Sequence, residues 1–372
     1  MNKLKVLTLA GTRPEIIRLS CIIKKFDQYF DHYFVYTGQN SVKELSDVFF
    51  KNFEIKPKYN FKVKNQNSIF CIAEILKKTG SLIKKIKPDC FFVLGDTNSA
   101  LSSIVAKKMQ IPIFHYEAGN RCYDDRVPEE INRRIVDTIS DVNLTYSDSS
   151  KNNLLRENFP PDKVFNVGSP LFELFEKYKE KILSNNILKK INVKNNQFIL
   201  ISLHRAENLD NKKNLHKIIS SINFIAEKFK VKIIFSTHPR TKKILKQFKL
   251  NKNINLCKPF NFFEYNKLQI SAKIVLSDSG SISEESHILN FPAINIRETH
   301  ERHEAMEKGV VTMAEFSENA LYHSIIRTLN NFNLHEKKNH IPDYEQSNVS
   351  GKIVQIVSSY KNYINRKNYY KI

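Results

Sequence analysis

The stretch from Ile274 to Ser286, IVLSDSGSISEES, decides the fold. Its first residues are aliphatic or β-branched and end at Ser277 and Asp278, which predicts a short buried strand. A glycine follows, and a helix is predicted to begin near Ser281. A helix start leaves backbone N–H groups unpaired and carries partial positive charge, so it attracts phosphate, and Gly280 lets an anion approach the backbone closely.

The side chains around this turn fit the rest of a nucleotide. Ser279, Ser281 and Ser283 supply hydroxyl groups. Glu284 and Glu285 fall in the first turn of the predicted helix, where a carboxylate suits the helix dipole and accepts hydrogen bonds from a sugar hydroxyl. The stretch therefore predicts a site for the ribose and diphosphate of a nucleotide. Taken alone, it also fits an ordinary capped helix with acidic residues in its first turn.

Length and composition indicate a globular protein of two domains. The chain has 372 residues and a hydrophobic fraction of 41%, which suits two domains that each bury a core. No segment approaches the roughly 20 apolar residues of a membrane-spanning helix. The N-terminal residues MNKLKVLTLAGTRPE lack a small-residue cleavage site and turn charged at Arg13, so we expect a buried first strand.

The charge is strongly positive. Lys and Arg total 59 against 38 Asp and Glu, a formal net charge of +21, which raises the question of nucleic acid or an anionic membrane as partner. The lysines are scattered in pairs among asparagines, and no nucleic-acid motif with suitably spaced aromatic residues is present. We therefore expect neither partner. A positive field would still attract a doubly charged nucleotide sugar.

The cysteines indicate a reduced, cytoplasmic protein. There are five of them, far apart in the sequence and without a CxxC pair. An odd number of scattered cysteines favours free thiols and no structural metal.

Strands alternate with helices in two series, which predicts an α/β protein with two doubly wound parallel sheets. The strands predicted for the first series are residues 5–10, 32–37, 89–94, 112–116, 142–146 and 164–167. A polar, lysine-rich helical stretch, 171–196, connects this series to the second. The strands predicted for the second series are residues 198–203, 232–235, 274–277 and 293–296. We expect the carboxyl edges of the two sheets to face one another across a cleft.

Charged residues follow several of these strands, at the edge where open α/β sheets bind ligands. Arg13 and Arg18 come after the first strand and are candidate anion contacts, although arginines near a helix start are common at surfaces. Asp96 and Glu117 follow two further strands. Asp96 also fits a cap of the next helix, whereas Glu117 precedes Ala118 and a glycine, which form a turn with no obvious helix to cap.

The segment 127–141, VPEEINRRIVDTISD, is predicted to be an amphipathic helix. Glu129 and Arg133 are four residues apart and share a face, as do Glu130 and Arg134. Two surface ion pairs worth a few tenths of a kcal/mol each are one interpretation. The other is that one pair faces the binding cleft, because this helix directly follows the loop after Glu117.

Eight motifs in this order resemble the non-hydrolysing UDP-N-acetylglucosamine 2-epimerase family. They are GTRPEIIR, GDTNS, HYEAGNR, PEEINRR, SLHRAEN, STHPRT, SDSGSISEES and RETHERHEA. The resemblance implies a glycosyltransferase-B-like fold of two Rossmann-type domains, residues 1–170 and a UDP-binding domain at 171–350, with the active site in the cleft between them. It also implies a C-terminal helix in 351–372 that crosses back to the first domain, a homodimer, and no metal or nicotinamide cofactor.

Within the family, the sequence is more similar to the enzymes that build precursors of capsule and O-antigen. NRCYDDRVPEEINRR, SDSGSISEES and NIRETHERHEAM carry this finer resemblance. Four residues differ from those of the archetypal enzymes. Arg18 replaces a lysine, Asn40 replaces a histidine, Ser281 replaces a glycine and His303 replaces the usual proline. Asn40 brings into question the allosteric activation by substrate that the archetypal enzymes show, and Arg18 and His303 bring into question mainly the identity of the sugar.

The resemblance implies a UDP-2-acetamido sugar as substrate and a reaction through elimination of UDP to a 2-acetamidoglycal. The matching catalytic acids, bases and charge stabilisers are Asp96, Glu117, Glu129 and His204. The matching substrate and UDP contacts are Arg13, Arg18, Arg133, Ser279, Gly280, Ser281, Glu285 and Arg302. His238 and Arg240 are weaker candidates. Which acid takes the C2 proton and which returns it stays open.

Several functions remain in competition. The favoured substrate is UDP-2-acetamido-2,6-dideoxy-L-talose, giving UDP-N-acetyl-L-fucosamine. The alternatives are UDP-N-acetylglucosamine, giving UDP-N-acetylmannosamine, and a UDP-2,3-diacetamido uronic acid. More remote are a hydrolysing epimerase, a glycosyltransferase on the same fold and a nucleotide-binding protein without catalysis.

Overall fold

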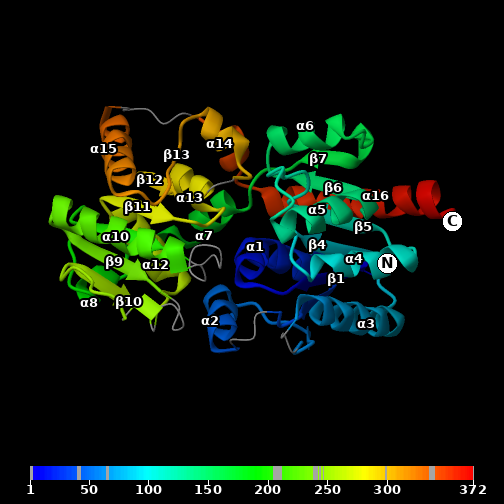
Figure 1. Cartoon of the computed structure of the whole chain (residues 1–372). Coiled ribbons are helices and arrows are strands. Elements are labelled where there is room, and N and C mark those ends of the chain that lie inside the picture. Colours follow the sequence, from blue (N-terminus) through cyan, green and yellow to red (C-terminus); the bar gives the residue numbers. More distant parts are fainter. Residues whose placement is uncertain are drawn as a thin grey trace. The chain divides into compact units, whose positions relative to one another are not determined.

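The computed structural model describes residues 3–39, 43–63, 67–203, 212–237, 242, 244–245, 247–297, 300–334 and 340–371. They form two units, Met1–Glu176 with Pro342–Ile372 and Lys177–Ile341 (Figure 1). Each unit holds one parallel sheet, so the predicted pair of Rossmann-like sheets is confirmed. Within the described ranges, every helix is too short or too polar to cross a membrane.

The first unit contains a seven-stranded sheet in the order β3-β2-β1-β4-β5-β6-β7. Its strands are β1 (Lys5–Ala10), β2 (Asp31–Tyr36), β3 (Tyr59–Asn60), β4 (Cys90–Leu94), β5 (Ile113–Tyr116), β6 (Val142–Thr145) and β7 (Val164–Asn166). Its helices are α1 (Arg13–Tyr29), α2 (Lys43–Phe53), α3 (Ser68–Ile86), α4 (Ser103–Lys108), α5 (Pro128–Ile139), α6 (Asp148–Arg156), α7 (Leu171–Leu183), which runs on into the second unit, and α16 (Val349–Tyr369). Short 3-10 turns are η1 (Ala100–Ser102), η2 (Pro161–Lys163) and η3 (Pro342–Tyr344).

Successive side chains of a strand point to opposite faces of the sheet, and the side chains on both faces of this sheet are buried under helices. Leu7 and Phe91 pair in register and pack in a core with Val136 of α5 and residues of α3 and α4. Phe92 points the other way and meets Phe26 of α1 edge to face, with ring centroids 5.1 Å apart. A strand buried on both faces reads as a continuous apolar run, which is why β1 and β4 were recognisable in the sequence.

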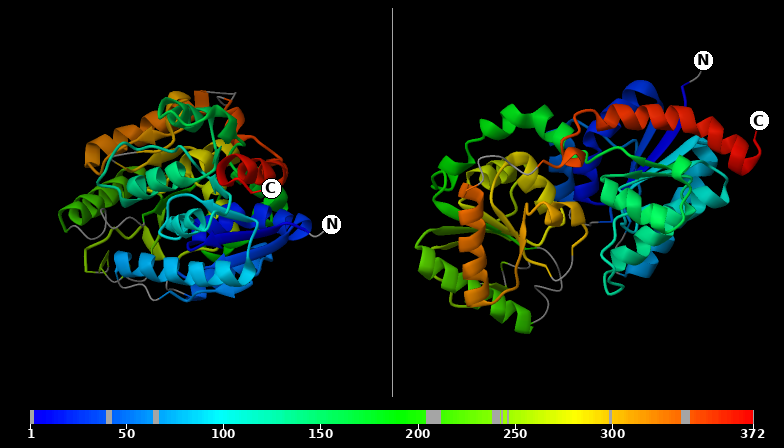
Figure 2. Two further views of the ribbon diagram at one scale, coloured as in Figure 1. Left: turned by 90° about the vertical axis from the view of Figure 1, so that its right-hand side faces the viewer. Right: turned by 90° about the horizontal axis from the view of Figure 1, so that it is seen from above.

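The helix α16 packs against α1 and belongs to the first unit, as Figure 2 shows. Its end is held by Asp141, whose Oδ2 accepts a hydrogen bond from Tyr369 Oη at 2.8 Å and whose Oδ1 accepts one from Asn368 at 2.8 Å. Its start is held by Glu173, which accepts a hydrogen bond from the Ser350 N–H at 2.8 Å. Helix α16 is thus fixed at its start to α7 and at its end to the residue that precedes β6.

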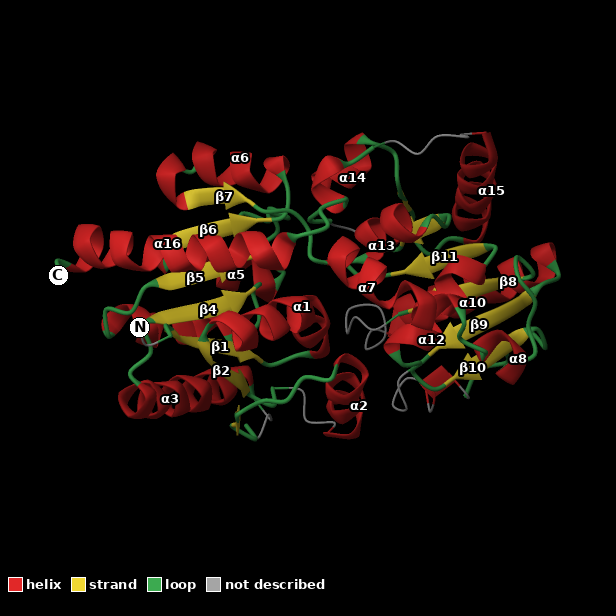
Figure 3. Cartoon of the chain, turned by 180° about the vertical axis from the view of Figure 1, so that it is seen from behind, coloured by secondary structure: helices red, strands yellow, loops and turns green. Residues whose placement is uncertain are grey.

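The second unit contains a six-stranded sheet in the order β10-β9-β8-β11-β12-β13 (Figure 3). Its strands are β8 (Phe198–Ser202), β9 (Lys232–Ser236), β10 (Ile254–Cys257), β11 (Ile274–Ser277), β12 (Ala293–Asn295) and β13 (Thr312–Met313). Its helices are α8 (Ile187–Lys190), α10 (Lys212–Phe229), α12 (Phe262–Ser271), α13 (Ile282–Leu289), α14 (His303–Glu307) and α15 (Glu318–Leu334). The side chains of β8 alternate between the two faces of this sheet and belong to two cores. Ile199 and Ile201 lie in one core, and Phe198 and Leu200 lie in the other.

Three strands, β3, β10 and β13, were not predicted. They are the outermost strands, apart from β7, and two of them have only two residues. The helix predicted to follow Asp96 begins as the 3-10 turn η1 and becomes α-helical only at Ser103. The edge strands were missed because short edge segments owe their conformation to the neighbouring strands more than to a sequence period. A 3-10 turn is a frequent start of an α-helix and has no distinct sequence signal.

Candidate active site

In the first unit, loops after neighbouring strands come together at the carboxyl edge of the sheet. Gly11 follows β1, and a Cβ atom at this position would lie 2.1 Å from Ser99 Oγ and 2.6 Å from Thr37 Oγ1. These two hydroxyls also bond to each other at 2.8 Å. A glycine is therefore required for the loops after β1, β2 and β4 to approach so closely.

Glu15 joins the loop after β1 to the loop after β4. Its Oε2 accepts hydrogen bonds from the N–H groups of Gly11 and Thr12 at 3.0 and 2.8 Å. Its Oε1 accepts one from Thr97 Oγ1 at 3.1 Å. Glu15 is only 2% exposed, and this burial raises its pKa to about 7 despite those hydrogen bonds. The carboxyl thereby ties the two residues before Arg13 to the residue after Asp96.

Asp96 is held by Arg133 of α5. Arg133 Nε and Nη2 donate to Asp96 Oδ2 at 2.9 and 2.5 Å. Nη1 of the same arginine donates to Glu130 at 3.0 Å, and Glu130 also pairs with Arg134 at 3.1 Å. The predicted Glu130–Arg134 pair is therefore present, Arg133 faces the sheet edge, and Glu129 is exposed in the first turn of α5.

Glu117 follows β5 with a left-handed backbone, φ 72°, which is unusual for a residue other than glycine. Its Oε1 lies 3.8 Å from Nη1 of Arg18, a residue whose guanidinium also stacks on Tyr146 at 5.2 Å from the ring centroid. A Cβ atom at Gly95 would lie 3.2 Å from Glu117 Oε2. Glu117 therefore lies close to the loop that carries Asp96.

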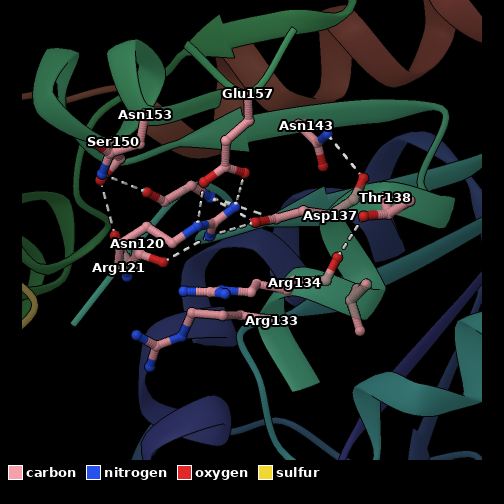
Figure 4. Close-up of polar contacts among 12 residues, drawn as sticks. Asn120, Arg121, Arg133, Arg134, Asp137, Thr138, Asn143, Ser150, Asn153 and Glu157 are labelled. Carbon is pink, nitrogen blue, oxygen red and sulfur yellow. Dashed lines mark hydrogen bonds and ion pairs between the residues drawn. The ribbon is translucent and has the colours of Figure 1, made fainter. Parts of the chain in front are cut away.

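A buried ion-pair network supports the strained loop of Glu117 (Figure 4). Arg121 is 1% exposed, and its Nη1 donates to Asp137 at 2.7 Å while Nε donates to Glu157 at 2.8 Å. The N–H of Gly119 points to both oxygens of Asp137 at 3.3 Å, and Asn153 donates to the Gly119 carbonyl at 3.0 Å. Backbone strain persists at such sites only where the surroundings over-determine it, and this network provides that support.

His115, in β5, connects the same network to the loop after β4. Its Nε2 donates to the Gly95 carbonyl at 2.9 Å, since a carbonyl can only accept, and its Nδ1 lies 2.9 Å from Asp137 Oδ1. No catalytic or binding role was predicted for His115, Arg121 or Asp137. His115 and Arg121 belong to the HYEAGNR motif, and His115 and Asp137 are ionisable residues at positions where the strand and helix periods predict burial.

In the second unit, the turn after β11 carries the predicted cluster of hydroxyls. Ser279 and Ser281 bond through their Oγ atoms at 2.9 Å. Ser281 Oγ also donates to Glu285 Oε1 at 2.7 Å, and Gln269 donates to Glu285 Oε2 at 2.5 Å. The Ser279 N–H donates to Ser277 Oγ at 3.1 Å. These contacts fix the Glu285 carboxylate beside the start of α13.

Tyr265 of α12 lies beneath this turn, hydrogen-bonded to Ser202 and Ser277. Burial raises the pKa of its phenol, and the nearby carboxylate of Glu285 raises it further. The phenol therefore stays neutral and ties the ends of β8 and β11 together. Tyr265 was not predicted to belong to the site, because helix periodicity indicates only that an aromatic residue of α12 belongs to the hydrophobic core.

Two arginines follow β12 and approach the same turn. Arg302 Nε donates to Glu284 Oε2 at 3.2 Å. Arg297 Nη2 donates to Glu301 Oε1 at 3.1 Å. A Cβ atom at Gly280 would lie 3.4 Å from Arg297 Nη1 and 3.3 Å from Glu301 Oε2. The start of α13 is therefore lined by guanidinium groups, which suits a phosphate.

The structure thus groups the predicted residues by unit. In the first unit it brings together Asp96, Glu117, Arg18 and Arg133, with Arg13 at the start of α1, where burial lowers its pKa. In the second unit it brings together Ser279, Gly280, Ser281, Glu285 and Arg302. The predicted residues His204, His238, Arg240 and Asn40 lie outside the described ranges. Among the residues placed by the structure, no group of three or more His, Cys, Asp or Glu side chains is arranged to hold a metal ion.

Comparison with known proteins points to one family. Residues 24–358 match the family model described as UDP-N-acetylglucosamine 2-epimerase. A UDP-N-acetylglucosamine 2-epimerase structure from Rickettsia bellii is 42% identical, covers 100% of both chains and has a TM-score of 0.93. A Methanocaldococcus jannaschii UDP-GlcNAc 2-epimerase in complex with UDP-GlcNAc and UDP is 34% identical, with 95% of this chain and 99% of that chain covered and a TM-score of 0.87.

A relative named for another substrate and a structure of much lower sequence identity also match. The UDP-2,3-diacetamido-2,3-dideoxy-D-glucuronate 2-epimerase of Pseudomonas aeruginosa is 31% identical over 304 residues, or 80% of this chain and 84% of the relative. Acinetobacter baumannii MurG, at 13% identity and a TM-score of 0.54 over 96% of this chain and 99% of its own, shares the glycosyltransferase-B-like fold alone.

Proposed function

This chain belongs to the UDP-N-acetylglucosamine 2-epimerase family, and from that premise we propose that it inverts C2 of a UDP-linked 2-acetamido sugar by eliminating UDP and adding it back. The observation that carries the proposal is a pair of carboxylates at neighbouring strand ends, each beside an arginine. Asp96 lies against Arg133 at 2.5 Å, and Glu117 lies 3.8 Å from Arg18.

The chemistry explains why so many ionisable groups are needed. The C2 proton of an acetamido sugar is not acidic, so its direct removal is slow. If a base takes this proton while the C1–O bond breaks, the electron pair of that bond leaves with UDP and a neutral 2-acetamidoglycal forms. Return of a proton to the opposite face of C2 and re-addition of UDP to C1 complete the inversion. The enzyme therefore needs acid–base groups on two faces of the sugar and a site that holds UDP meanwhile.

We assign these groups to described residues of each unit and to His204. Asp96, Glu117 and Glu129 of the first unit, together with His204, are the proposed acids, bases and charge stabilisers, and Arg18 and Arg133 orient two of the carboxylates. Proposed contacts of UDP and the sugar are Arg13, Ser279, Gly280, Ser281, Glu285 and Arg302. Glu285 is already oriented by Ser281 and Gln269, so its carboxylate can accept hydrogen bonds from the ribose hydroxyls.

We propose UDP-2-acetamido-2,6-dideoxy-L-talose as the substrate and a capsule or O-antigen precursor as the product. The sequence NRCYDDRVPEEINRR and the form of the RETHERHEA segment support this choice. UDP-N-acetylglucosamine is the second candidate, favoured by the similarity to the Rickettsia and Methanocaldococcus proteins. A UDP-2,3-diacetamido uronic acid is the third, favoured by the Pseudomonas relative.

Proton NMR in deuterium oxide tests the reaction and its substrate together. We expect the purified protein to place deuterium at C2 of the 6-deoxy-L-sugar nucleotide and to form the C2 epimer. Deuterium at C2 of UDP-N-acetylglucosamine, with a manno product, would show that UDP-N-acetylglucosamine, the second candidate, is the substrate. Net release of UDP would indicate the hydrolysing reaction, and exchange with none of the three nucleotides would refute the epimerase proposal.

We further propose that the chain acts as a homodimer. Five large apolar residues are exposed on α3, α4 and α5, where α4 packs against both other helices: Ile69 (73%), Phe70 (74%), Ile104 (36%), Ile131 (50%) and Ile135 (37%). Exposed apolar side chains of this size on neighbouring helices favour a protein interface. Light scattering should give a dimeric mass for the wild type and a monomeric mass for Phe70→Glu. A monomeric wild type at micromolar concentration would refute the dimer.

A further inference from the structure

Arg297 carries a buried N–H group that the contacts described so far leave without a partner. Its side chain is 3% exposed, and one end of the guanidinium is fixed because Nη2 donates to Glu301 at 3.1 Å. Nη1 is buried and, among the residues that the structure places, has no hydrogen-bond partner. Buried polar groups are nearly always hydrogen-bonded, and those that are not call for a ligand or another explanation.

The open end of the guanidinium points to the start of α13. Nη1 lies 3.4 Å from the position that a Cβ atom of Gly280 would occupy, and Gly280 comes two residues before Ile282, the first residue of the eight-residue helix α13. The first turn of a helix presents backbone N–H groups that attract anions. A guanidinium N–H and a helix start thus converge on one point, and the absence of a side chain at Gly280 keeps that point open.

The carboxylates nearby are already neutralised or hydrogen-bonded. Glu301 pairs with Arg297 itself, Glu284 with Arg302 at 3.2 Å, and Glu285 accepts from Ser281 and Gln269. The positive charge of Arg297 is therefore oriented by Glu301 on one side and has its other side available. An arginine held in this way is preorganised for a phosphate, because little rotamer freedom remains to be lost on binding.

We propose that Arg297 binds the terminal phosphoryl group of UDP through Nη1. This inference rests on the proposed function. When the C1–O bond of the substrate breaks, its electron pair stays on an oxygen of that phosphoryl group, which gains one negative charge. A guanidinium at this oxygen stabilises the departing UDP more strongly than it stabilises the intact substrate, so it lowers the barrier to elimination and retains UDP for re-addition.

Calorimetric titration with UDP and with UMP tests the inference, because UMP lacks the terminal phosphoryl group. We expect Arg297→Gln to weaken UDP binding by about tenfold or more while UMP binding changes less than about twofold. Gly280→Ala should show the same pattern, since its methyl group occupies the space beside Nη1. Arg327→Gln is the matched control: it removes a positive charge from α15, where Arg327 contacts Ser324, and should leave both affinities unchanged.

The outcomes separate the inference from the proposed function. If wild type binds UDP and Arg297→Gln binds it equally well, Arg297 does not hold the terminal phosphoryl group. Equal loss of UDP and UMP binding in Arg297→Gln would make Arg297 a structural residue and would also overturn the inference. A wild type that binds neither nucleotide would refute the proposed function and this inference with it.

Discussion

Glutamine in place of Glu15 should remove the part of the pH dependence of folding stability that this buried carboxyl causes. Burial raises the pKa of this carboxyl from 4.5 to about 7 in the folded protein. A carboxyl with a raised pKa stabilises the fold fully below the unfolded value of 4.5, and this contribution is lost as the pH rises through about 7. Glutamine does not ionise. Its amide oxygen can accept from Gly11 and Thr12, and its NH₂ group can donate to Thr97 Oγ1, so the contacts of the loop are retained.

The size of the effect follows from the shift. From 4.5 to about 7 is about 2.5 pKa units, and one unit corresponds to about 1.4 kcal/mol. The free energy of unfolding of Glu15→Gln relative to wild type should therefore rise by about 3 kcal/mol between about pH 4.5 and pH 8. Subtraction of the wild-type curve removes the contribution of every other titrating group, because those groups are common to both proteins.

Urea unfolding followed by far-ultraviolet circular dichroism measures this difference, since the chain has no tryptophan to report by fluorescence. Glu54→Gln is the matched control, because Glu54 is 69% exposed and pairs with Lys24 at the surface. Its curve should stay within about 0.5 kcal/mol of wild type at each pH. Parallel curves for wild type and Glu15→Gln would refute the reasoning, because they would show that the folded environment does not favour the protonated carboxyl.

Three further substitutions test other parts of the structure. Asp141→Asn replaces one acceptor oxygen of the buried carboxylate by an NH₂ group, so that Tyr369 and Asn368 lose one of their two acceptors and Lys107 loses its ion pair. The substitution should expose α16 to limited proteolysis, with a loss of about 2 to 4 kcal/mol in the free energy of unfolding. Arg121→Gln leaves Asp137 buried without its cation and should cost about 3 to 5 kcal/mol in thermal or urea unfolding. Glu117→Gln should abolish C2 deuterium exchange while the UDP affinity stays within about tenfold, and loss of UDP binding would instead indicate a structural role.

The fold was largely predictable because its central strands are buried on both faces. β4, β8 and β11 appear in the sequence as apolar runs, and β1 as an apolar run interrupted only by Thr8; each ends in a polar turn that the doubly wound topology places at the carboxyl edge of the sheet. The edge strands β3 and β13 gave no such signal. Two residues contain no period, and their pairing depends on β2 and β12 being already in place.

The site was predictable only in part, for a related reason. Topology alone places Asp96 and Glu117 after neighbouring strands, β4 and β5. It does not reveal that Arg133 reaches Asp96, because that contact depends on how α5 packs across the sheet. The left-handed backbone of Glu117 was equally hidden, since the sequence does not show which buried groups hold the loop.

That loop links stability to chemistry. A left-handed backbone at a residue other than glycine costs about 1 to 3 kcal/mol, and the buried side chains of Arg121 and Asp137 hold it in place through contacts with the backbone around Gly119 and Asn120. Neither side chain has to touch a substrate to matter for turnover. Because the strain is released when this network is broken, Glu117 would leave its position beside Arg18 before the sheet itself unfolds. Substitutions at Asp137 should therefore reduce turnover under conditions where the protein is still folded and still binds UDP at the site proposed in its second unit.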